Sequence, residues 1–177
     1  MTDAPAADVA GRQALFDQAI DAYGPALQRL TYAYEAVADR RPDLLQEIYL
    51  ALWQSLQRFD GRCALGTWVY RVAHNTATSH CIRRRDRLRL VSIDDIDVAA
   101  QGTNVAGALD DARARERLLA LIHRLQPIDR QVVLLYLEGL DAAAAGEIVG
   151  LSASNVATKI HRLKKLLAEQ FHEGSRR

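Results

Sequence analysis

One predicted helix carries polar side chains that could bind a strand of nucleic acid. From Thr67 onwards, apolar residues recur at spacings of three and four, as on the buried face of an amphipathic helix: Val69, Val72, Ala73 and Ala77. Thr67 is predicted to cap its N-terminus. The opposite face is polar and basic: Arg71, Asn75, Thr78 or Ser79, and Arg83. Amides and hydroxyls can contact bases and guanidinium groups can contact phosphates, so this face predicts a nucleic-acid-binding surface.

The residues on either side of this helix extend that prediction. Residues 59–66 contain two glycines and no regular period, which indicates a loop. Trp68 and Tyr70 lie at the loop–helix junction, where an unpaired base could stack on them. Large aromatic side chains are usually mostly buried, so the alternative is that both rings fill the core beneath the loop. At the other end, the helix runs into a cationic cluster: Arg83, Arg84, Arg85, Arg87 and Arg89.

A second polar and basic helix is predicted near the C-terminus. A short Ala-rich helix, residues 142–149, precedes a turn at Gly150-Leu151-Ser152, and Ser152 is predicted to cap the next helix. The apolar face of that helix steps by three and four residues: Ala153, Val156, Ile160, Leu163 and Leu167. Its other face is polar and basic: Asn155, Thr158, Lys159, Arg162 and Lys165. This order is typical of a helix-turn-helix, in which the second helix enters the major groove. A plain amphipathic surface helix would show the same face, but the preceding turn favours DNA binding.

Composition and charge fit two DNA-contacting modules. The 177 residues suffice for one medium domain or two small ones, and the low aromatic content (6%) and four prolines favour helix over sheet. The net charge is only +1, but it is unevenly distributed. Residues 83–89 contain five Arg and one Asp, residues 92–111 contain five Asp and no cation, and residues 158–165 contain four Lys or Arg. Two basic patches separated by an acidic segment predict two modules and a linker.

Other classes of protein find little support. No apolar run approaches the roughly 20 residues of a membrane span, and the N-terminus lacks the features of a signal peptide, so a cytoplasmic protein is expected. An enzyme or metal protein using His74, His80 and Cys81 is a second alternative. Cys63 and Cys81 are the only cysteines, and their spacing of 18 matches no zinc pattern. The sequence also has no phosphate loop, nucleophile elbow or paired-carboxylate motif. We therefore expect no catalytic residue, no metal and no cofactor.

The segment F-x-G-x(5)-T-W-V-Y-R-V-A-H-N-T-A resembles the promoter-melting segment of bacterial sigma factors of the extracytoplasmic-function (ECF) type. The matching residues are Gly61, Thr67, Trp68, Tyr70, Arg71, Ala73, Asn75, Thr76 and Ala77. In that family the loop captures a flipped base of the melted minus-ten element, and the following helix reads and supports the strand. The resemblance implies minus-ten contacts by Gly61, Arg62, Thr67, Trp68, Tyr70, Arg71, Asn75, Arg83, Arg84 and Arg85.

The preceding predicted helix, residues 44–58 with Asp43 as its N-cap, resembles the segment of the same family that binds the coiled coil of the polymerase clamp. An ordinary core helix would show a similar pattern. The resemblance implies polymerase contacts by Asp43, Gln46, Glu47, Leu50 and Trp53. One departure is that Arg40-Arg41-Pro42 stands where the family usually has acidic residues, which should weaken attraction to a basic clamp. Phosphorylation of Thr31 or Ser55 is one way in which negative charge could be restored.

The C-terminal module resembles the domain of these factors that binds the minus-thirty-five element. The matches are Leu125, Pro127, Arg130, Gly139, Leu140, Gly150, Leu151, Ser152, Val156 and Arg162. The resemblance implies DNA contacts by Ser154, Asn155, Thr158, Lys159, Arg162 and Lys165. The sequence departs from the family pattern at Asp141, Ala144, Gly146, Asn155 and Lys159, so the bases that are read do not carry over. Glycine at position 146 should also weaken its short helix by up to about 1 kcal/mol.

Together these features predict an all-α protein of two small helical domains joined by a flexible linker. We expect a disordered N-terminus at residues 1–10, a sigma region 2-like bundle at 11–90, an acidic linker at 91–112 and a region 4-like helix-turn-helix domain at 113–177. Gly24-Pro25 predicts a kink, or a junction of two helices, early in the first domain.

The resemblance implies a sigma factor with no enzymatic activity. It would bind the clamp and flap of core RNA polymerase and promoter DNA, act at the nucleoid, and be open to control by an anti-sigma factor or a kinase. The alternative is a helix-turn-helix regulator that acts without polymerase. That alternative does not explain the predicted helix that carries Trp68, Tyr70, Arg71 and Asn75.

Overall fold

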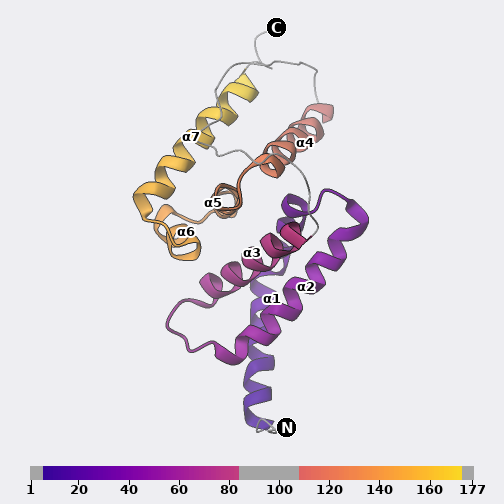
Figure 1. Ribbon diagram of the computed structural model, residues 1–177, viewed down its shortest axis with the longest axis vertical. Helices are drawn as coiled ribbons and strands as arrows, with labels where there is room; N and C mark the ends of the chain where they lie inside the picture. The colour runs from indigo at the N-terminus through magenta and orange to yellow at the C-terminus, as the bar shows by residue number, and fades with distance from the viewer. Residues whose placement is uncertain (1–5, 84–107, 173–177) are drawn as a thin grey trace. The chain divides into compact units, whose positions relative to one another are not determined.

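The computed structural model describes residues 6–83 and 108–172, which belong to two compact units, Met1–Asp86 and Arg87–Arg177. Throughout the described residues the regular elements are helices and no strand occurs, which confirms the all-α prediction (Figure 1). The first unit contains α1 (Ala6–Tyr34), α2 (Arg41–Ser55) and α3 (Leu65–Arg83), with short 3₁₀ turns at Ala38–Arg40 and Leu56–Arg58. The second contains α4 (Ala108–Arg124), α5 (Pro127–Leu137), α6 (Ala142–Val149) and α7 (Ala153–His172).

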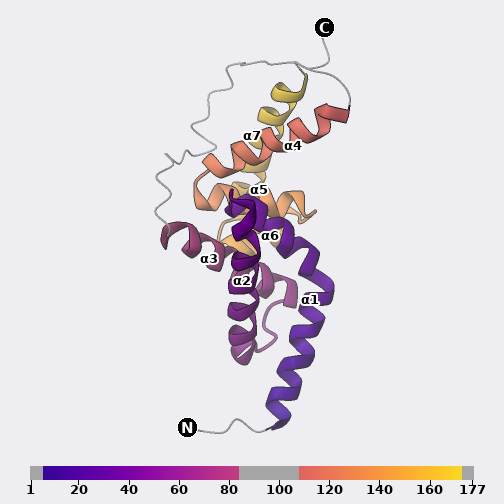
Figure 2. The same cartoon turned by 90° about the vertical axis from the view of Figure 1, so that its right-hand side faces the viewer.

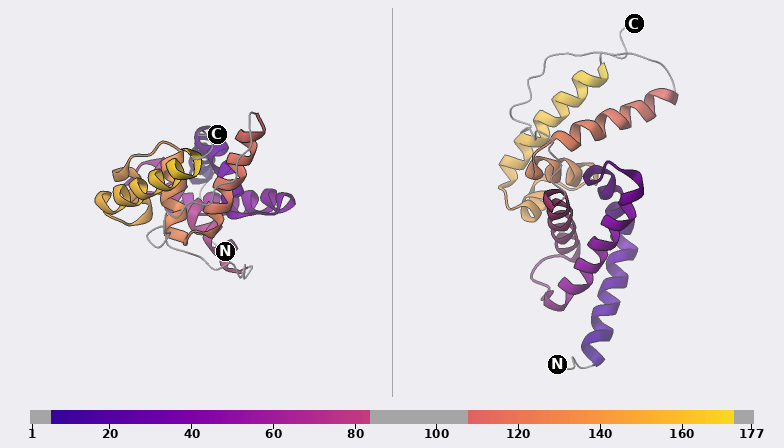
Figure 3. Two further views of the ribbon diagram at one scale, coloured as in Figure 1. Left: turned by 90° about the horizontal axis from the view of Figure 1, so that it is seen from above. Right: turned by 45° about the vertical axis from the view of Figure 1, so that its right-hand side comes forward.

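The first unit is a three-helix bundle in which each helix packs on the other two. One stripe of α2, spaced by four residues, is buried at its centre: Leu44, Ile48 and Leu52. The apolar face predicted for α3 is buried against it at Val69, Ala73 and Ala77. Figures 2 and 3 show that α1 extends past the other two helices at its N-terminal end. The bundle leaves the opposite faces of α2 and α3 available for contacts.

α1 differs from its prediction in two ways. It begins at Ala6 and so includes part of the segment expected to be disordered; residues 1–5 lie outside the described residues. It also continues through Gly24 and Pro25 as one helix, so of the two outcomes predicted there the junction of two helices does not occur. Pro25 is exposed, whereas Ala26 and Leu27 beside it are buried. Burial of these neighbours in the bundle offsets the hydrogen bond that proline cannot donate.

A buried histidine lies in the centre of the first unit. His74 is 2% exposed, and its Nδ1 atom lies 3.0 Å from the hydroxyl of Tyr34, to which it is hydrogen-bonded. Burial lowers the pKa of His74 to about 3, because the charged imidazolium loses its hydration there. His74 is therefore neutral in the folded protein at neutral and mildly acidic pH.

This burial predicts that the first unit loses stability in acid. Between pH 6.5 and about 3 the unfolded chain takes up a proton on His74 that the folded chain does not. The free energy of unfolding should fall by about 2 kcal/mol between pH 7 and pH 5 from this group. Urea titrations followed by the fluorescence of Trp53 and Trp68 would measure it, with His74→Gln as the comparison. Parallel acid losses in the wild type and the variant would contradict the assignment.

The second unit contains the predicted helix-turn-helix, formed by α6 and α7 (Figure 3). The Asp141 side chain caps α6 by accepting a hydrogen bond from the amide of Ala144 at 2.8 Å. Ser152 caps α7 by accepting one from the amide of Asn155 at 3.3 Å, which confirms that prediction. Between them, Gly150 adopts φ 75°, and the amides of Gly150 and Leu151 donate to the carbonyl of Gly146. This is the hydrogen-bond pattern by which a glycine ends a helix.

The turn also explains the glycine at position 146. A Cβ atom built on Gly146 would lie 2.6 Å from the carbonyl oxygen of Leu151, a backbone atom. Gly146 is buried, so neither chain segment can move away without disturbing the turn. Glycine at position 146 lowers the intrinsic stability of α6, as the sequence predicts. The close approach of Leu151 nevertheless requires glycine there, because any side chain would clash with that carbonyl oxygen.

The start of α5 holds the second unit together through a buried arginine. Arg130 is 7% exposed, and its guanidinium donates hydrogen bonds to three carbonyl oxygens at the end of α4: those of Ile122 (3.1 Å), His123 (2.7 Å) and Leu125 (3.3 Å). The last carbonyls of a helix have no partner within it and carry partial negative charge. Arg130 therefore satisfies the end of α4 and fixes α5 beside it. α4 itself begins at Ala108, inside the predicted linker, whose residues 91–107 lie outside the described residues.

Candidate nucleic-acid interface

An open groove of about 590 Å³ lies between α2 and α3. Its walls carry amides, hydroxyls, charged groups and one large apolar side chain: Glu47, Leu50, Ala51, Gln54, Asn75, Thr76, Ser79 and Arg83. α2 supplies the first four residues and α3 supplies the rest. The groove therefore brings together residues that the sequence assigned to two different partners, polymerase on α2 and melted DNA on α3.

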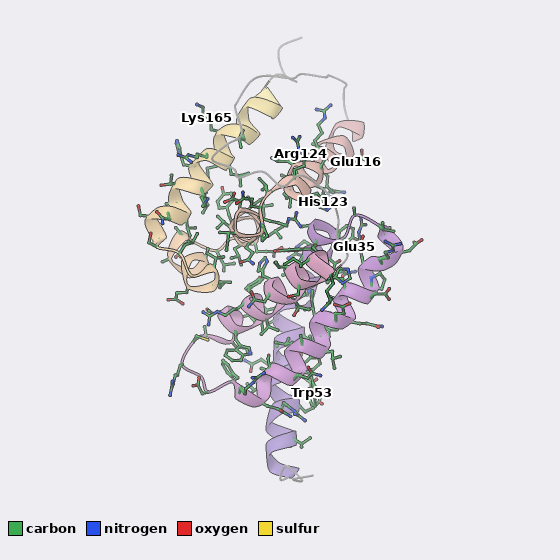
Figure 4. All side chains as sticks on the ribbon, in the orientation of Figure 1. Glu35, Trp53, Glu116, His123, Arg124 and Lys165 are labelled. Carbon is green, nitrogen blue, oxygen red and sulfur yellow. The ribbon has the colours of Figure 1, made fainter. Side chains whose placement is uncertain are left out.

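An ionic network lies beside this groove. The Nη2 atom of Arg83 lies 2.5 Å from Oε2 of Glu47, and Nδ1 of His80 lies 3.2 Å from the other oxygen of the same carboxylate. The Nε2 atom of His80 faces Oε2 of Glu35 at 3.5 Å. Glu35, labelled in Figure 4, is 4% exposed and follows the end of α1. The network thus connects all three helices of the first unit.

The loop before α3 presents a tight exposed turn. Gly61 adopts φ 73°, a conformation that favours glycine. The Asp60 carboxylate accepts a hydrogen bond from the amide of Arg62 at 3.1 Å and pairs with the guanidinium of Arg62 at 3.0 Å. Gly61 and Arg62 are both exposed, so this turn can meet a ligand.

The aromatic residues at the loop–helix junction mostly support the fold. Tyr70 is 7% exposed, and its ring packs on Tyr23 with centroids 5.7 Å apart, so it cannot stack on a base. Trp68 is half-buried: its Nε1 donates to the hydroxyl of Ser55 at 2.9 Å, and its ring meets Phe59 at 5.5 Å. Tyr70 therefore follows the alternative in which the ring fills the core, and Trp68 anchors the base of the loop.

Thr67 also differs from its prediction. α3 begins at Leu65, two residues before Thr67, and the amide of Trp68 donates to the carbonyl of Ala64 at 3.2 Å. Thr67 lies inside the first turn and is 9% exposed, so it neither caps the helix nor faces a ligand. Arg71, Asn75 and Arg83 on the predicted polar face are exposed, as the periodicity indicated. Arg84 and Arg85 lie outside the described residues.

The predicted polymerase face of α2 is mostly open. Asp43 and Gln46 are exposed, Glu47 is half-buried, and Leu50 is 58% exposed, which is unusual for a leucine within a bundle. Trp53 faces α1 instead: the Arg12 guanidinium lies 4.2 Å from its ring centroid, and Phe16 packs against it at 5.5 Å. Trp53, labelled in Figure 4, is therefore half-buried and already packed against α1.

The structure changes the interpretation of the arginines before α2 and of the two proposed phosphorylation sites. The Arg41 guanidinium donates to the carbonyls of Glu35 and Ala36, each at 3.1 Å, and lies over the ring of Tyr32. The positive charge of Arg41 is therefore engaged by carbonyl oxygens that follow the C-terminal end of α1. Thr31 is 1% exposed and donates to the carbonyl of Gln28, and the Ser55 hydroxyl already bonds to Leu52 and Trp68. Neither hydroxyl is presented to a kinase in the folded unit.

α7 presents most of its predicted DNA-binding face to solvent. The exposed residues are Ser154, Asn155, Thr158, Arg162 and Lys165. Lys159 is the exception, because its ammonium lies 2.6 Å from the carboxylate of Asp129, which is 2% exposed. Removing Lys159 would take one charged partner from a buried carboxylate, which is costly. Lys159 therefore holds α7 on α5, which corrects its predicted role as a DNA contact.

The residues of the metal-site alternative have separate protein partners. His74 bonds to Tyr34, His80 lies between Glu35 and Glu47, and the Cys81 thiol donates to the carbonyl of Tyr34 at 3.2 Å. Within residues 6–83 and 108–172, no group of three or more His, Cys, Asp or Glu side chains is arranged to hold a metal ion. In the same residues, no helix has the length and apolar character needed to cross a bilayer.

Comparison with known proteins gives the family. The family model for sigma-70 region 2 matches residues 19–87, and the model for sigma-70 region 4 matches residues 115–167. The ECF RNA polymerase sigma factor SigE of Mycolicibacterium smegmatis is 28% identical over 95% of this chain and 67% of its own length. SigW of Bacillus subtilis is 24% identical over 92% of each chain, and the ECF sigma-E factor of Escherichia coli is 29% identical over 83% of this chain and 75% of its own.

A solved structure shares the fold. The structure of CnrH in complex with the cytosolic domain of CnrY matches with a TM-score of 0.60 and 22% identity, over 92% of this chain and 91% of that one. The two family models match the chain in the order region 2, region 4, and the relatives that span most of it are ECF sigma factors. The chain therefore belongs to the sigma-70 family, as an alternative sigma factor of the ECF type that directs RNA polymerase to promoters.

Proposed function

We propose that three surfaces carry out the steps of initiation. The exposed face of α2 binds the clamp of core RNA polymerase, the loop at residues 61–64 with the exposed face of α3 holds the melted minus-ten strand, and α7 binds the minus-thirty-five element. The observation that carries this proposal is the α2–α3 groove, where Leu50 and Asn75 line one concave surface. A partner on α2 and a strand on α3 would lie next to each other there.

The proposed polymerase contacts are the open residues of α2: Asp43, Gln46, Glu47 and Leu50, together with Trp53. Leu50 supplies the apolar centre of this surface, and the polar residues form its rim, which is the usual anatomy of an interface. Polar contacts at a rim govern which partner is accepted more than they govern affinity.

The proposed minus-ten contacts are Gly61 and Arg62 in the loop and Arg71, Asn75 and Arg83 on α3, followed by Arg84 and Arg85. The Asn75 amide can hydrogen-bond to an unpaired base, and the guanidinium groups can pair with backbone phosphates. Melting needs no covalent step, because a surface that binds the extruded base and single strand better than duplex shifts the equilibrium toward open DNA. Trp68, Phe59 and Ser55 support the loop from behind.

The proposed minus-thirty-five contacts are Ser154, Asn155, Thr158, Arg162 and Lys165. A recognition helix places its N-terminal residues against base edges, so Ser154 and Asn155 lie where bases would be read. Arg162 and Lys165 lie further along α7 and would meet phosphates. The second unit would also contact the polymerase flap. These steps would take place in the cytoplasm, at the nucleoid.

A protein regulator of the anti-sigma kind is proposed on the analogy of CnrH, whose structure was solved with the cytosolic domain of CnrY. Such a regulator would compete for the surfaces named above. A kinase acting at Thr31 or Ser55 receives no support from their bonding. The polymerase-independent regulator is not favoured, because residues 19–87 match sigma-70 region 2 and that function does not explain such a domain.

Replacing Leu50 with aspartate should reduce the affinity for core polymerase about tenfold or more, because a carboxylate would replace the apolar centre of the interface. The free protein should keep its stability, since Leu50 is 58% exposed. Fluorescence anisotropy of labelled protein titrated with core polymerase would measure the change. Val9→Asp, the same kind of change at an exposed site of α1, serves as the matched control. Equal affinities for Leu50→Asp and wild type would contradict the assignment of this face.

A further inference from the structure

One proposed strand contact is already occupied by a carboxylate. Nη2 of Arg83 lies 2.5 Å from Oε2 of Glu47, across the groove that both residues line. The Arg83 side chain is 61% exposed and that of Glu47 is 40% exposed, so a ligand can reach both groups. Glu47 belongs to the proposed polymerase face and Arg83 to the proposed strand face. The free protein therefore pairs a residue of one interface with a residue of the other.

We propose that the Glu47–Arg83 ion pair couples the two interfaces, so that the free protein holds Arg83 away from DNA and polymerase binding releases it. The inference rests on the proposed function of the two faces and adds a means by which one controls the other. A phosphate that approaches Arg83 meets a guanidinium whose Nη2 is already paired with Glu47, and it must lie beside the negative charge of that carboxylate. A cationic group of the clamp that takes over Glu47 removes both obstacles.

The geometry makes the competition specific to Glu47. His80 lies 3.2 Å from its Oε1 and Arg83 lies 2.5 Å from its Oε2, so both oxygens of this carboxylate are engaged from α3. Asp21 on α1 is also an exposed carboxylate, and among the described residues the ion pair of Arg83 is with Glu47. A change at Asp21 therefore alters the net charge of the first unit without altering the pair. By linkage, strand binding at Arg83 must favour polymerase binding at Glu47 to the same extent.

The test uses the full-length protein and a labelled single-stranded oligo(dT) of about 12 nucleotides, which reports backbone contacts without a base preference. Glu47→Gln should bind this strand about threefold more tightly than the wild type, the scale expected for an exposed ion pair. Asp21→Asn makes the same change in net charge at an exposed site of α1 and should bind as the wild type does. The gain should disappear in the double variant Glu47→Gln/Arg83→Gln. Equal affinities of Glu47→Gln and Asp21→Asn, or a gain that survives in the double variant, would overturn the proposal.

Salt dependence supplies a readout that altered packing would not change. In the wild type, a phosphate that binds Arg83 releases its own counterion, but Glu47 then attracts a cation from solution, so few ions are released overall. In Glu47→Gln no cation is taken up, so one counterion is released for this phosphate. The slope of log affinity against log salt should therefore steepen by about 0.7 in the variant. An unchanged slope would count against the proposal.

A final arm separates this inference from the proposed function. With polymerase at saturating concentration, the advantage of Glu47→Gln should vanish, and Arg83→Gln should weaken strand binding. If Arg83→Gln has no effect in that complex, its proposed strand contact is wrong, and the coupling is wrong with it. If Arg83→Gln weakens the complex but Glu47→Gln gives no gain in the free protein, the strand contact stands and the coupling alone is wrong.

Discussion

Arg130→Met is expected to lower the stability of the second unit by about 3 kcal/mol. Methionine retains much of the buried apolar stem but removes the donors to the carbonyls of Ile122, His123 and Leu125. These carbonyls lie at the end of α4 and would lose partners that water cannot easily replace. The loss should exceed that of any exposed arginine, because Arg130 is 7% exposed.

The two units can be followed separately in one sample. Both tryptophans, Trp53 and Trp68, lie in the first unit, so their fluorescence reports its unfolding, whereas helical circular dichroism reports both units. Arg130→Met should add an earlier transition to the dichroism trace and leave the fluorescence transition in place. Arg124→Met, at an exposed position of α4, is the control. Indistinguishable melting of the two variants would show that the buried guanidinium is not needed.

Asn75→Ala is expected to reduce promoter opening by about 10- to 100-fold, the range for loss of one good hydrogen-bonded base contact. Asn75 is exposed on α3 and lines the groove, so alanine should leave the bundle intact. Its affinity for core polymerase should be unchanged, because the proposed polymerase contacts lie on α2. Permanganate reactivity of unpaired thymines would measure opening, and anisotropy would measure polymerase affinity. Gln57→Ala removes an exposed amide outside the groove and should affect neither. Equal loss of opening and of polymerase affinity in Asn75→Ala would contradict the proposed role.

Much of the fold could be predicted because it follows from local periodicity. The stripes that include Val69, Ala73 and Ala77 on α3, and Val156, Ile160 and Leu163 on α7, are buried as their spacing indicates. The Ser152 cap was also predicted, since a capping bond spans only three residues. Helix boundaries also depend on tertiary contacts. Gly24-Pro25 predicts a kink or a junction of two helices, and packing in the bundle maintains one helix through Pro25, so the junction is absent.

The placements of the predicted site residues that differ from expectation share one physical cause. Periodicity assigns a residue to a face of its helix but does not reveal a partner distant in sequence. Lys159 lies on the polar face of α7, yet it pairs with Asp129, thirty residues away, and so serves the core. The Glu47–Arg83 pair and the hydrogen bonds from Arg130 to the end of α4 also join residues on different helices, which periodicity does not relate. The polymerase and promoter assignments came from the resemblance of the motifs, which periodicity alone could not supply.

The most direct test of the account is run-off transcription from genomic promoters with core RNA polymerase, in the presence and absence of this protein. The account predicts that the protein associates with core polymerase and that transcripts arise from start points that core polymerase alone does not use. Asn75→Ala should associate but yield far less transcript, and Leu50→Asp should associate poorly. If the protein does not bind core polymerase and no new start point appears, the assignment of these surfaces to promoter opening is wrong.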